Sequence, residues 1–584
     1  MFTCSVYSTL FNMKDQKRQS ILLHSLNSFC QRTTLDGWSY VSNENTIFKR
    51  FIWFMALSGF LIFASYLLYL NIQVYIKSTT ITSLDTTTAP LDDLTFPSMQ
   101  ICNLNQVTAS FIESLGSFST FSLSANTFYR EFIYGSSKYN STGELNRIQK
   151  ITERLKKVYD WDGSSQIRKI SSPPCHDMLL SISRNVKTVT SYEAYKATSD
   201  AGMCCMIVPH WLFNEKRPNY STNYWNVQPK DMKHGLINGF RYLLDAETFD
   251  YDYRKSASTG FRIFIGDARD AAAITQKGIS IAVGTDTNIR FSVTKTFATN
   301  DAIINLDPKE RKCYLDSEIQ LPLLGPEGGF RYSDTNCYFE SVIQNVVKNC
   351  SCISDWAYSA EGIGYPDLKY CQGADIKCAE LWENNENNER AKILESIEVT
   401  SKHGRKVKKQ CLSRCERDEF HTAVSSSTYP NYFTFQHRKD ICYVFKKVYH
   451  ICHVETMSKR AQFLDFYEDV LQKFENHNTT LCDVIYKAYH SENMCKNSHI
   501  SNLDLKRNKR LVKFLFQYAK DNVAYVKVYM GDQFYTRIDM DQDITWLDFF
   551  NSVGGLLGLC LGLSLVSIFE LFYHIIQLFF TLLK

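Results

Sequence analysis

The sequence predicts a membrane protein in which two transmembrane helices flank a large, disulfide-rich extracellular domain of the α+β class. Three observations lead to this fold class. Two long apolar runs lie near the two ends of the chain. Of the 19 cysteines, 16 lie between Cys102 and Cys495, and an even number in one segment indicates disulfides formed in an oxidising compartment. The 65 basic and 61 acidic residues nearly balance and are scattered, which argues against a nucleic-acid partner.

The first apolar run covers residues 51–76 and contains no charged residue. Its length exceeds the roughly 20 residues that a helix needs to cross a bilayer. A signal peptide is the alternative, but the run begins too deep in the chain, is too long and lacks an A-x-A exit. We therefore expect a transmembrane helix at 51–76.

The second apolar run covers residues 549–583 and is interrupted only by Glu570. At about 1.5 Å per residue, a straight helix of this length would reach roughly 50 Å, well beyond the 30 Å hydrocarbon core. The helix must therefore tilt, extend beyond the bilayer, or break. A break or a close helix contact is easiest at one of four glycines, Gly554, Gly555, Gly558 and Gly562.

The flanking charges orient the two spans. Six basic residues precede the first span: Lys14, Lys17, Arg18, Arg32, Lys49 and Arg50. The excess of positive charge on the inner side of membranes puts both termini in the cytoplasm. The segments are then 1–50 (cytoplasmic), 51–76 (first span), 77–545 (extracellular), 546–583 (second span and pore) and 584 (cytoplasmic). The four N-x-S/T glycosylation sequons, at Asn140, Asn219, Asn349 and Asn478, all lie in the extracellular segment.

Within the extracellular segment the pattern indicates both strands and helices. Residues 78–94 are rich in Thr and Asp and are expected to form an extended connector, and residues 383–390 a polar loop. Strands are predicted at 260–265, 278–283, 289–293 and 523–529. A short helix is predicted at 345–352, and residues 111–157 have helix-like apolar spacing.

Two motifs carry a resemblance to a known family. Residues 96–103 read F-P-S-M-Q-I-C-N, and residues 554–564 read G-G-L-L-G-L-C-L-G-L-S, with Glu570 six residues further on. The first resembles the F-P-x-x-x-x-C-N signature of the degenerin/epithelial sodium channel family, and the second resembles its G-G-x-x-G-L-x-x-G-x-S signature. Matches run from Asp36-Gly37 to Glu570. Residues 202–205 (G-M-C-C) and 306–313 (L-D-P-K-E-R-K-C) look like the insect pickpocket branch.

The resemblance implies a ladder of four disulfides: Cys313–Cys415, Cys337–Cys411, Cys350–Cys378 and Cys352–Cys371. Two family cysteines that bond each other are both absent, at Ser341 and Lys409, so no reactive thiol is left outside the cell. A four-cysteine zinc site is the alternative for the last two pairs. No other metal site and no cofactor is expected.

Eight further cysteines have pairings that the sequence leaves open. Cys102, Cys175, Cys204 and Cys205 should form two bridges in an undetermined order. The other four, Cys442, Cys452, Cys482 and Cys495, lie in a segment of about 425–506 that is longer than is usual in the family. This segment is expected to be an inserted, separately cross-linked subdomain.

The resemblance also implies a pore. The family's G/S-x-S triplet narrows the pore where subunits meet, and here it reads Gly562-Leu563-Ser564. Glu570 would form a ring of charge that favours cations. Two alternatives remain open, because Gly554, Gly558 and Gly562 could form a helix-packing stripe and Glu570 could lie at the inner interface.

The resemblance implies a role in channel gating for three positions. Asn551 falls at the family's degenerin position, where a small residue normally permits closure. Gly37 keeps the glycine of a His-Gly pair before the first span, but Asp36 replaces the histidine. Tyr75 lies where the family couples the extracellular domain to the helices, although an ordinary interfacial tyrosine is equally compatible with the pattern.

A basic tetrapeptide at 507–510 raises the possibility of proteolytic activation. Arg507, Lys509 and Arg510 fit a furin-type R-x-K-R site. A solvated basic segment is the simpler interpretation of the same residues.

The function implied is that of a subunit of an amiloride-sensitive sodium channel of the plasma membrane, in a homo- or hetero-trimer that conducts Na⁺ across the lipid bilayer. A non-conducting accessory or receptor subunit is the main alternative, because Asp36, Asn551 and Tyr573 depart from the family pattern. An ecto-enzyme is disfavoured because the chain lacks H-E-x-x-H, G-x-S-x-G and P-loop motifs. An ATP-gated channel would share the topology but not the two motifs.

Overall fold

The computed structural model describes residues 28–43, 46–77, 80–94, 96–116, 170–184, 187–188, 192–209, 232–252, 258–267, 270, 273–324, 330–354, 371, 374–383, 392–400, 405–471, 480–491, 495 and 508–583. The chain divides into two compact units. The helix unit comprises Met1–Ser83, Ala298–Arg311 and Met540–Lys584, and the sheet unit comprises Leu84–Phe297 and Lys312–Asp539.

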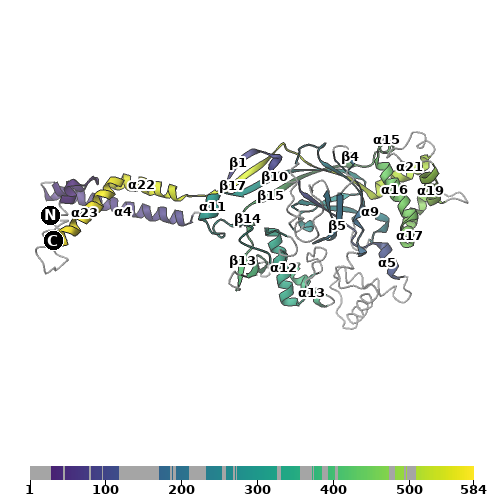
Figure 1. The fold of residues 1–584 in the computed structure, drawn as a ribbon, viewed down its shortest axis with the longest axis horizontal. Coiled ribbons are helices and arrows are strands. Elements are labelled where there is room, and N and C mark those ends of the chain that lie inside the picture. Colours follow the sequence, from purple (N-terminus) through teal and green to yellow (C-terminus); the bar gives the residue numbers. More distant parts are fainter. Residues whose placement is uncertain are drawn as a thin grey trace. The chain divides into compact units, whose positions relative to one another are not determined.

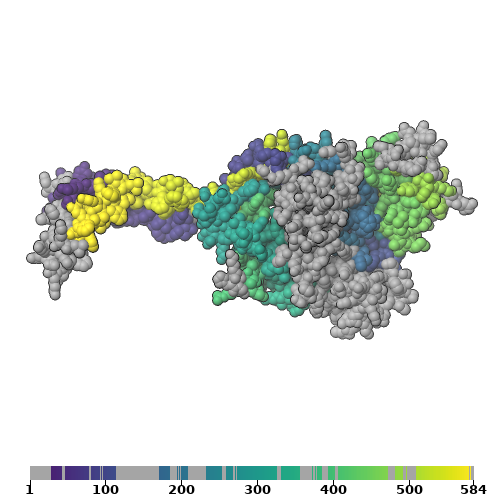
Figure 2. Space-filling view, in the orientation of Figure 1, coloured from purple at the N-terminus to yellow at the C-terminus, as the bar shows by residue number. Residues whose placement is uncertain are grey.

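The helix unit contains the two apolar runs. Its helices are α3 (Trp38–Asn43), α4 (Ile47–Lys77), α11 (Asn300–Asn305), α22 (Trp546–Leu561) and α23 (Leu565–Leu583). Helix α4 is long and apolar enough to cross a membrane. Helices α22 and α23 are long and apolar enough only as a pair, and the pair is bent by 73° at the break between them. Helix α22 packs along α4, and their surfaces touch in the space-filling view (Figures 1 and 2).

The sheet unit is built on two β-sheets. The larger has the order β1 (Thr80–Pro90), β17 (Phe534–Gln542), β10 (Thr285–Ala298), β16 (Val523–Met530), β7 (Phe240–Asp245), β3 (Leu179–Arg184) and β4 (Lys187–Thr188), with β15 (Arg417–Thr428) also paired to β10. The smaller has the order β5 (Tyr192–Ser199), β6 (Gly202–Pro209), β2 (Ser98–Asn103), β8 (Gly260–Gly266) and β9 (Ile279–Ala282). Strands β10 and β16 are parallel, whereas the smaller sheet is antiparallel throughout.

Both sheets contribute to one hydrophobic core. Ile101 and Ile263 from the smaller sheet lie in the same buried cluster as Phe291 and Val528 from the larger one. Phe96, the first residue of the F-P-x-x-x-x-C-N motif, packs its ring on Phe240 and Phe291 at centroid distances of 4.7 and 5.7 Å. The motif therefore joins the two sheets.

The last residue of that motif, Asn103, is almost completely buried. Its Nδ2 donates to the carbonyl of Ala246 at 3.0 Å, and its Oδ1 accepts from the Tyr251 hydroxyl at 2.6 Å. A buried amide must satisfy its donors and acceptor within the protein. Asn103 does so by linking β2 to the segment that follows β7.

The adjacent residues Cys204 and Cys205 on β6 bond to two different elements. Successive side chains on a strand point to opposite faces. Ile101 pairs with Cys205 in the antiparallel register, so Cys102 lies across from Cys204, and these two cysteines form one disulfide with a Cα–Cα distance of 4.3 Å. Cys205 faces the main core and bonds Cys175, the first residue of helix α9 (Cys175–Met178). This alternation fixes the order that the sequence left open.

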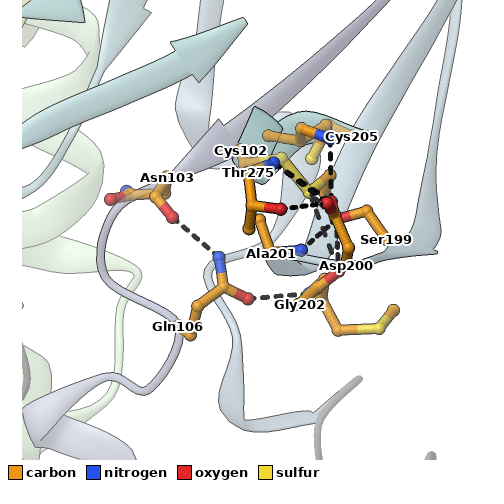
Figure 3. Close-up of a disulfide and its surroundings, with 12 residues drawn as sticks. Cys102, Asn103, Gln106, Ser199, Asp200, Ala201, Gly202, Cys205 and Thr275 are labelled. Carbon is orange, nitrogen blue, oxygen red and sulfur yellow. Dashed lines mark hydrogen bonds between the residues drawn. A yellow bond between two sulfur atoms is a disulfide. The ribbon is translucent and has the colours of Figure 1, made fainter. Parts of the chain in front are cut away.

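The turn before these cysteines is held by polar contacts (Figure 3). The carboxylate of Asp200 accepts hydrogen bonds from the Thr275 hydroxyl and from the backbone N–H of Ile274, the first residue of α10 (Ile274–Lys277). Gln106 accepts from the Met203 N–H and donates to the Asn103 carbonyl, both at 2.7 Å. Gly202 has φ +110°, and a Cβ there would meet the Gln106 side chain. The glycine of the G-M-C-C motif is therefore required by both its backbone and this close contact.

A second group of helices and strands in the sheet unit contains the predicted ladder of four disulfides. It comprises α12 (Asp334–Cys350), α13 (Ala374–Glu383), β11 (Cys313–Tyr314), β14 (Ser413–Arg414), β12 (Ser396–Thr400) and β13 (Lys406–Gln410). Four disulfides cross it: Cys313–Cys415, Cys337–Cys411, Cys350–Cys378 and Cys352–Cys371. These are the pairs that the resemblance implies, and they exclude the zinc alternative. Ser341, at a lost cysteine position, is buried and donates to the Ser396 carbonyl at 2.8 Å.

The inserted segment folds as helices around its own two disulfides, Cys442–Cys495 and Cys452–Cys482. Its elements are α15 (Tyr432–Phe435), α16 (Asp440–His453), α17 (Met457–Phe466), α18 (Glu468–Leu471) and α19 (Leu481–Ser491), joined by α21 (Lys509–Asn522). They group together in Figure 1. Leu243 of β7 and Tyr525 of β16 belong to the same hydrophobic cluster as these helices. The insert thus has its own two disulfides and shares a hydrophobic cluster with the sheets.

Four buried charges bind the insert to the rest of the sheet unit. Lys447 of α16 lies 3.0 Å from Asp177 and 2.8 Å from Glu247, and Lys459 of α17 lies 2.9 Å from Glu247 and 3.4 Å from Asp177. The four side chains are between 4% and 8% exposed. Burial opposes ionisation of Asp177, but the two lysines outweigh it and lower its pKa to about 2. We call these four residues the ionic cluster.

Two buried carboxyl groups adjoin the ionic cluster. Asp245 accepts a hydrogen bond from the Tyr518 hydroxyl at 2.8 Å, and Asp250 accepts from both the N–H and the hydroxyl of Ser110 at 2.7 Å. Burial raises the pKa of Asp245 to about 7, although Lys447 opposes the shift. Burial, reinforced by the charge of Glu247, also raises the pKa of Asp250 to about 7.

These raised pKa values predict that mild acid stabilises the sheet unit. The folded chain holds both protons to higher pH than the unfolded chain, so stability falls as pH rises from about 4 to 7 and then levels off. Lowering the pH from 8 to 6 should add about 1 kcal/mol per group to the free energy of unfolding. The measurement is the melting temperature of the full-length protein at both pH values. The double variant D245N/D250N should lose most of this difference, and an unchanged difference would contradict the assignment.

Candidate functional site

The second apolar run breaks at the Gly562-Leu563-Ser564 triplet. The residues at the two ends of the triplet explain why one helix stops and the next one starts. Gly562 ends α22 with φ +64°, and its N–H donates to the Gly558 carbonyl at 2.9 Å. A glycine in the left-handed region is the usual way to end a helix, because it has no Cβ to clash. Ser564 then begins α23, since its hydroxyl accepts from the Ser567 N–H at 3.2 Å while the Ser567 hydroxyl accepts from the Ser564 N–H at 3.3 Å.

A loop from the N-terminal side, residues 33–37, lies against this break. The N–H and the hydroxyl of Thr34 both donate to the carboxylate of Glu570 at 3.0 Å. The Thr34 and Ser567 hydroxyls are 2.9 Å apart, and the Ser564 and Ser567 hydroxyls are 3.0 Å apart. Each hydroxyl has one proton, so Ser567 donates to Thr34 if Thr34 donates to Glu570. These contacts connect Ser564 to Glu570 through a chain of hydroxyl groups.

The same loop contacts the triplet directly. A Cβ on Gly562 would lie 2.5 Å from Oδ2 and 2.6 Å from Cγ of Asp36. The neighbouring Gly37 has φ +83°, and a Cβ there would lie 2.9 Å from Cδ2 of Leu57 on α4. Both glycines therefore permit a conformation and a close approach that a larger residue would disturb. Phe29, just before the loop, packs edge-on to His574 at 5.2 Å between ring centroids.

At the other end of α22, contacts with α4 surround two of the predicted gating residues, Tyr75 and Asn551. Tyr75 packs its ring against Phe549 at 4.7 Å, and the Ser552 hydroxyl donates to Oδ1 of Asn71 at 3.2 Å. Asn551, between these two contacts in the sequence, is exposed. The first turn of α22 is held by a capping box between Thr545 and Asp548.

The predicted pore residues therefore lie together. Gly562, Leu563 and Ser564 form the break, and Ser564 is exposed. The carboxylate of Glu570 accepts two hydrogen bonds from Thr34, and its place in a ring of charge stays a prediction. Thr34 and Ser567 were missed by the sequence reasoning, because a single Thr or Ser in such a context carries no distinctive pattern.

The remaining predicted sites stay predictions. Asn349 is exposed in the last turn of α12, where its Nδ2 donates to the Asn345 carbonyl at 2.8 Å. Lys509 and Arg510 are exposed in the first turn of α21. The other predicted glycosylation and protease residues lie outside the described residues: Asn140, Asn219, Asn478 and Arg507.

One group in the described part of the chain has the spacing of metal ligands, namely Asp177, His450 and Glu455. Two lysine ammonium groups already lie on its carboxylates, because Lys447 contacts Asp177 at 3.0 Å and Lys459 contacts Glu455 at 3.3 Å. A cation in these positions repels a metal ion. The group is part of the buried ion-pair network rather than a metal centre.

An apolar helix, a broken apolar helix pair and a disulfide-rich unit are the features that the sequence predicts for a membrane protein. A family model described as amiloride-sensitive sodium channel matches residues 29–574. The chain belongs to this family, the degenerin/epithelial sodium channels, as the two motifs predicted. Its members are cation channels of the plasma membrane, not enzymes, and they are built from several subunits.

The comparison with curated proteins points to the predicted branch of the family. The chain is 21% identical over 361 residues to Pickpocket protein 28 of Drosophila melanogaster. The matched region covers 56% of this chain and 54% of that protein. The chain thus spans about half the length of the curated relative that it matches. The similarity is to a pickpocket-type subunit, and the prediction of that type is confirmed.

Proposed function

We propose that this chain is a subunit of an amiloride-sensitive channel that conducts Na⁺ passively across the plasma membrane. Helix α4 is the first span, and α22 with α23 is the second span, broken within the membrane. Both termini are cytoplasmic, the segment 77–545 is extracellular, and three related or identical subunits surround one pore. The observation that carries the proposal is the helix break at residues 562–564.

The break supplies what a cation path needs inside a membrane. Backbone carbonyls at the end of α22 lose their helical partners, and the Ser564 hydroxyl adds an oxygen nearby. Such oxygens can replace part of the hydration shell of a cation. Glu570 adds a negative charge beyond the break, and each further subunit would add another.

A non-conducting accessory subunit is the competing proposal. It is motivated by Asp36, Asn551 and Tyr573, which differ from the residues that the resemblance leads one to expect. The two proposals differ in whether residues 562–564 line an open path.

Replacing Asn551 with a bulky residue distinguishes the proposals. Asn551 is exposed on α22, so a larger side chain such as tryptophan fits the single chain and would instead keep neighbouring subunits apart. We expect N551W to increase a Na⁺ current in oocytes, and we expect amiloride to block that current. N551A is the matched control. If both variants reach the surface and carry no current, alone or with related subunits, the accessory role is favoured.

A further inference from the structure

Asp36 stands beside the proposed constriction. Its carboxylate lies so close to Gly562 that a Cβ at that position would fall 2.5 Å from Oδ2 and 3.0 Å from the Asp36 Cβ. The loop that carries Asp36 is fixed two residues earlier by the hydrogen bonds of Thr34 to Glu570. The placement of Asp36 is therefore supported by two separate contacts with the broken span.

The carboxylate of Asp36 is not held by other groups. Within the described residues it has no hydrogen bond and no ion pair, and the side chain is exposed. Glu570 differs, because its carboxylate accepts two hydrogen bonds from Thr34. A carboxylate next to a membrane span is costly unless it meets water or a cation. Asp36 therefore requires water or a cation around its exposed carboxylate when the neighbouring span is in the membrane.

We propose that Asp36 is a specificity-determining residue of the conduction path, with its carboxylate facing the path on the cytoplasmic side of residues 562–564. This inference rests on the proposed function. Every subunit with this residue adds one carboxylate, and the resulting negative potential concentrates cations at the inner mouth. Divalent cations are attracted most strongly, so cytoplasmic Mg²⁺ dwells there and blocks the outward movement of Na⁺.

Position 36 is one where the chain departs from the pattern of the resembling family. The resembling family has a His-Gly pair here, and Asp36-Gly37 keeps only the glycine. A neutral imidazole would add no negative potential at neutral pH. The substitution exchanges a neutral or positive group for a negative one at a point that touches the constriction.

The test is block by Mg²⁺ applied to the cytoplasmic face of excised patches, with Na⁺ as the permeant ion and N551W as the background. D36N removes the charge with little change in size, D36E retains the charge, and D543N removes an exposed acidic residue expected on the extracellular side. We expect D36N to raise the half-blocking Mg²⁺ concentration roughly tenfold, whereas D36E and D543N remain near the starting value.

Ionic strength provides a second readout that a structural role would not change. D36N should lower the single-channel conductance in dilute salt, and the difference should shrink in concentrated salt because mobile ions screen the charge. Equal block and equal conductance in D36N and its parent would overturn the inference while leaving the channel function intact. If D36E and D36N weaken the Mg²⁺ block and lower the conductance equally, the inference is also overturned, because the negative charge would then not be the cause. If no variant carries current despite surface delivery, the proposed function itself fails.

Discussion

Replacing Lys459 with methionine is expected to destabilise the sheet unit by about 3–5 kcal/mol, because it leaves buried negative charge without compensation. Lys459 contacts Asp177, Glu247 and Glu455 at 3.4, 2.9 and 3.3 Å, and its side chain is 7% exposed. Without it, Lys447 alone must balance Asp177 and Glu247. We expect K459M to lower both surface delivery in cells and the melting temperature of the purified full-length protein.

Two further variants make this result interpretable. K446M removes an exposed lysine from α16 and should change stability by no more than about 0.5 kcal/mol. K459M/E247Q removes one acid together with the base and leaves Lys447 paired with Asp177, so it should be more stable than K459M. If K459M behaves like K446M, or if E247Q adds to the damage instead of relieving it, the ionic cluster does not hold the insert in place.

The local patterns in the sequence predicted strands well where one face is buried. The expected strands at 260–265, 278–283, 289–293 and 523–529 lie in or overlap β8, β9, β10 and β16. The Thr- and Asp-rich composition of residues 78–94 predicts an extended connector, and residues 80–90 within it form β1 at the edge of the larger sheet. An edge strand with mostly exposed side chains has no alternation of polar and apolar residues to reveal it.

Helix α12 shows how a helix start escapes detection. A short helix was predicted at 345–352, whereas α12 begins at Asp334. Its N-terminal half is rich in aromatic, Cys and Ser residues, which are weak helix formers. The helix is instead fixed by the Ser333 cap, the Cys337–Cys411 disulfide and the buried Glu340, which accepts from the N–H groups of Leu323 and Leu324. These are tertiary interactions that the local sequence does not reveal.

The candidate site was predictable in its motif but not in its contacts. The length of the second apolar run left three possibilities, a tilt, an extension beyond the bilayer or a break, and the four glycines limited where a break could occur. Thr34 and Glu570 are 536 residues apart in the chain, and no single-sequence pattern relates them. The same holds for Lys459 and Asp177, 282 residues apart, whose pairing joins the insert to the sheets. Such long-range contacts depend on the folded chain as a whole.

Replacing Gly562 with alanine is the sharpest test of the site, because it combines two independent penalties. At φ +64° an alanine costs roughly 1–2 kcal/mol relative to the right-handed region. Its Cβ would also fall within 3.0 Å of three atoms of Asp36, namely Oδ2, Cγ and Cβ. We expect G562A to reduce the Na⁺ current at least tenfold at equal surface density.

The two penalties can be separated by removing Asp36. In G562A/D36A the two shortest contacts, with Oδ2 and Cγ of Asp36, are gone, while the contact with its Cβ at 3.0 Å and the backbone strain remain. The current should therefore recover part of the way toward that of D36A alone. G554A is the control on the same helix, because a Cβ at Gly554 meets nothing within 4 Å in the single chain. Recovery in the double variant requires that residues 36 and 562 touch in the assembled channel. Equal losses in G554A and G562A, with no recovery, would instead mean that these glycines form a helix-packing stripe between subunits.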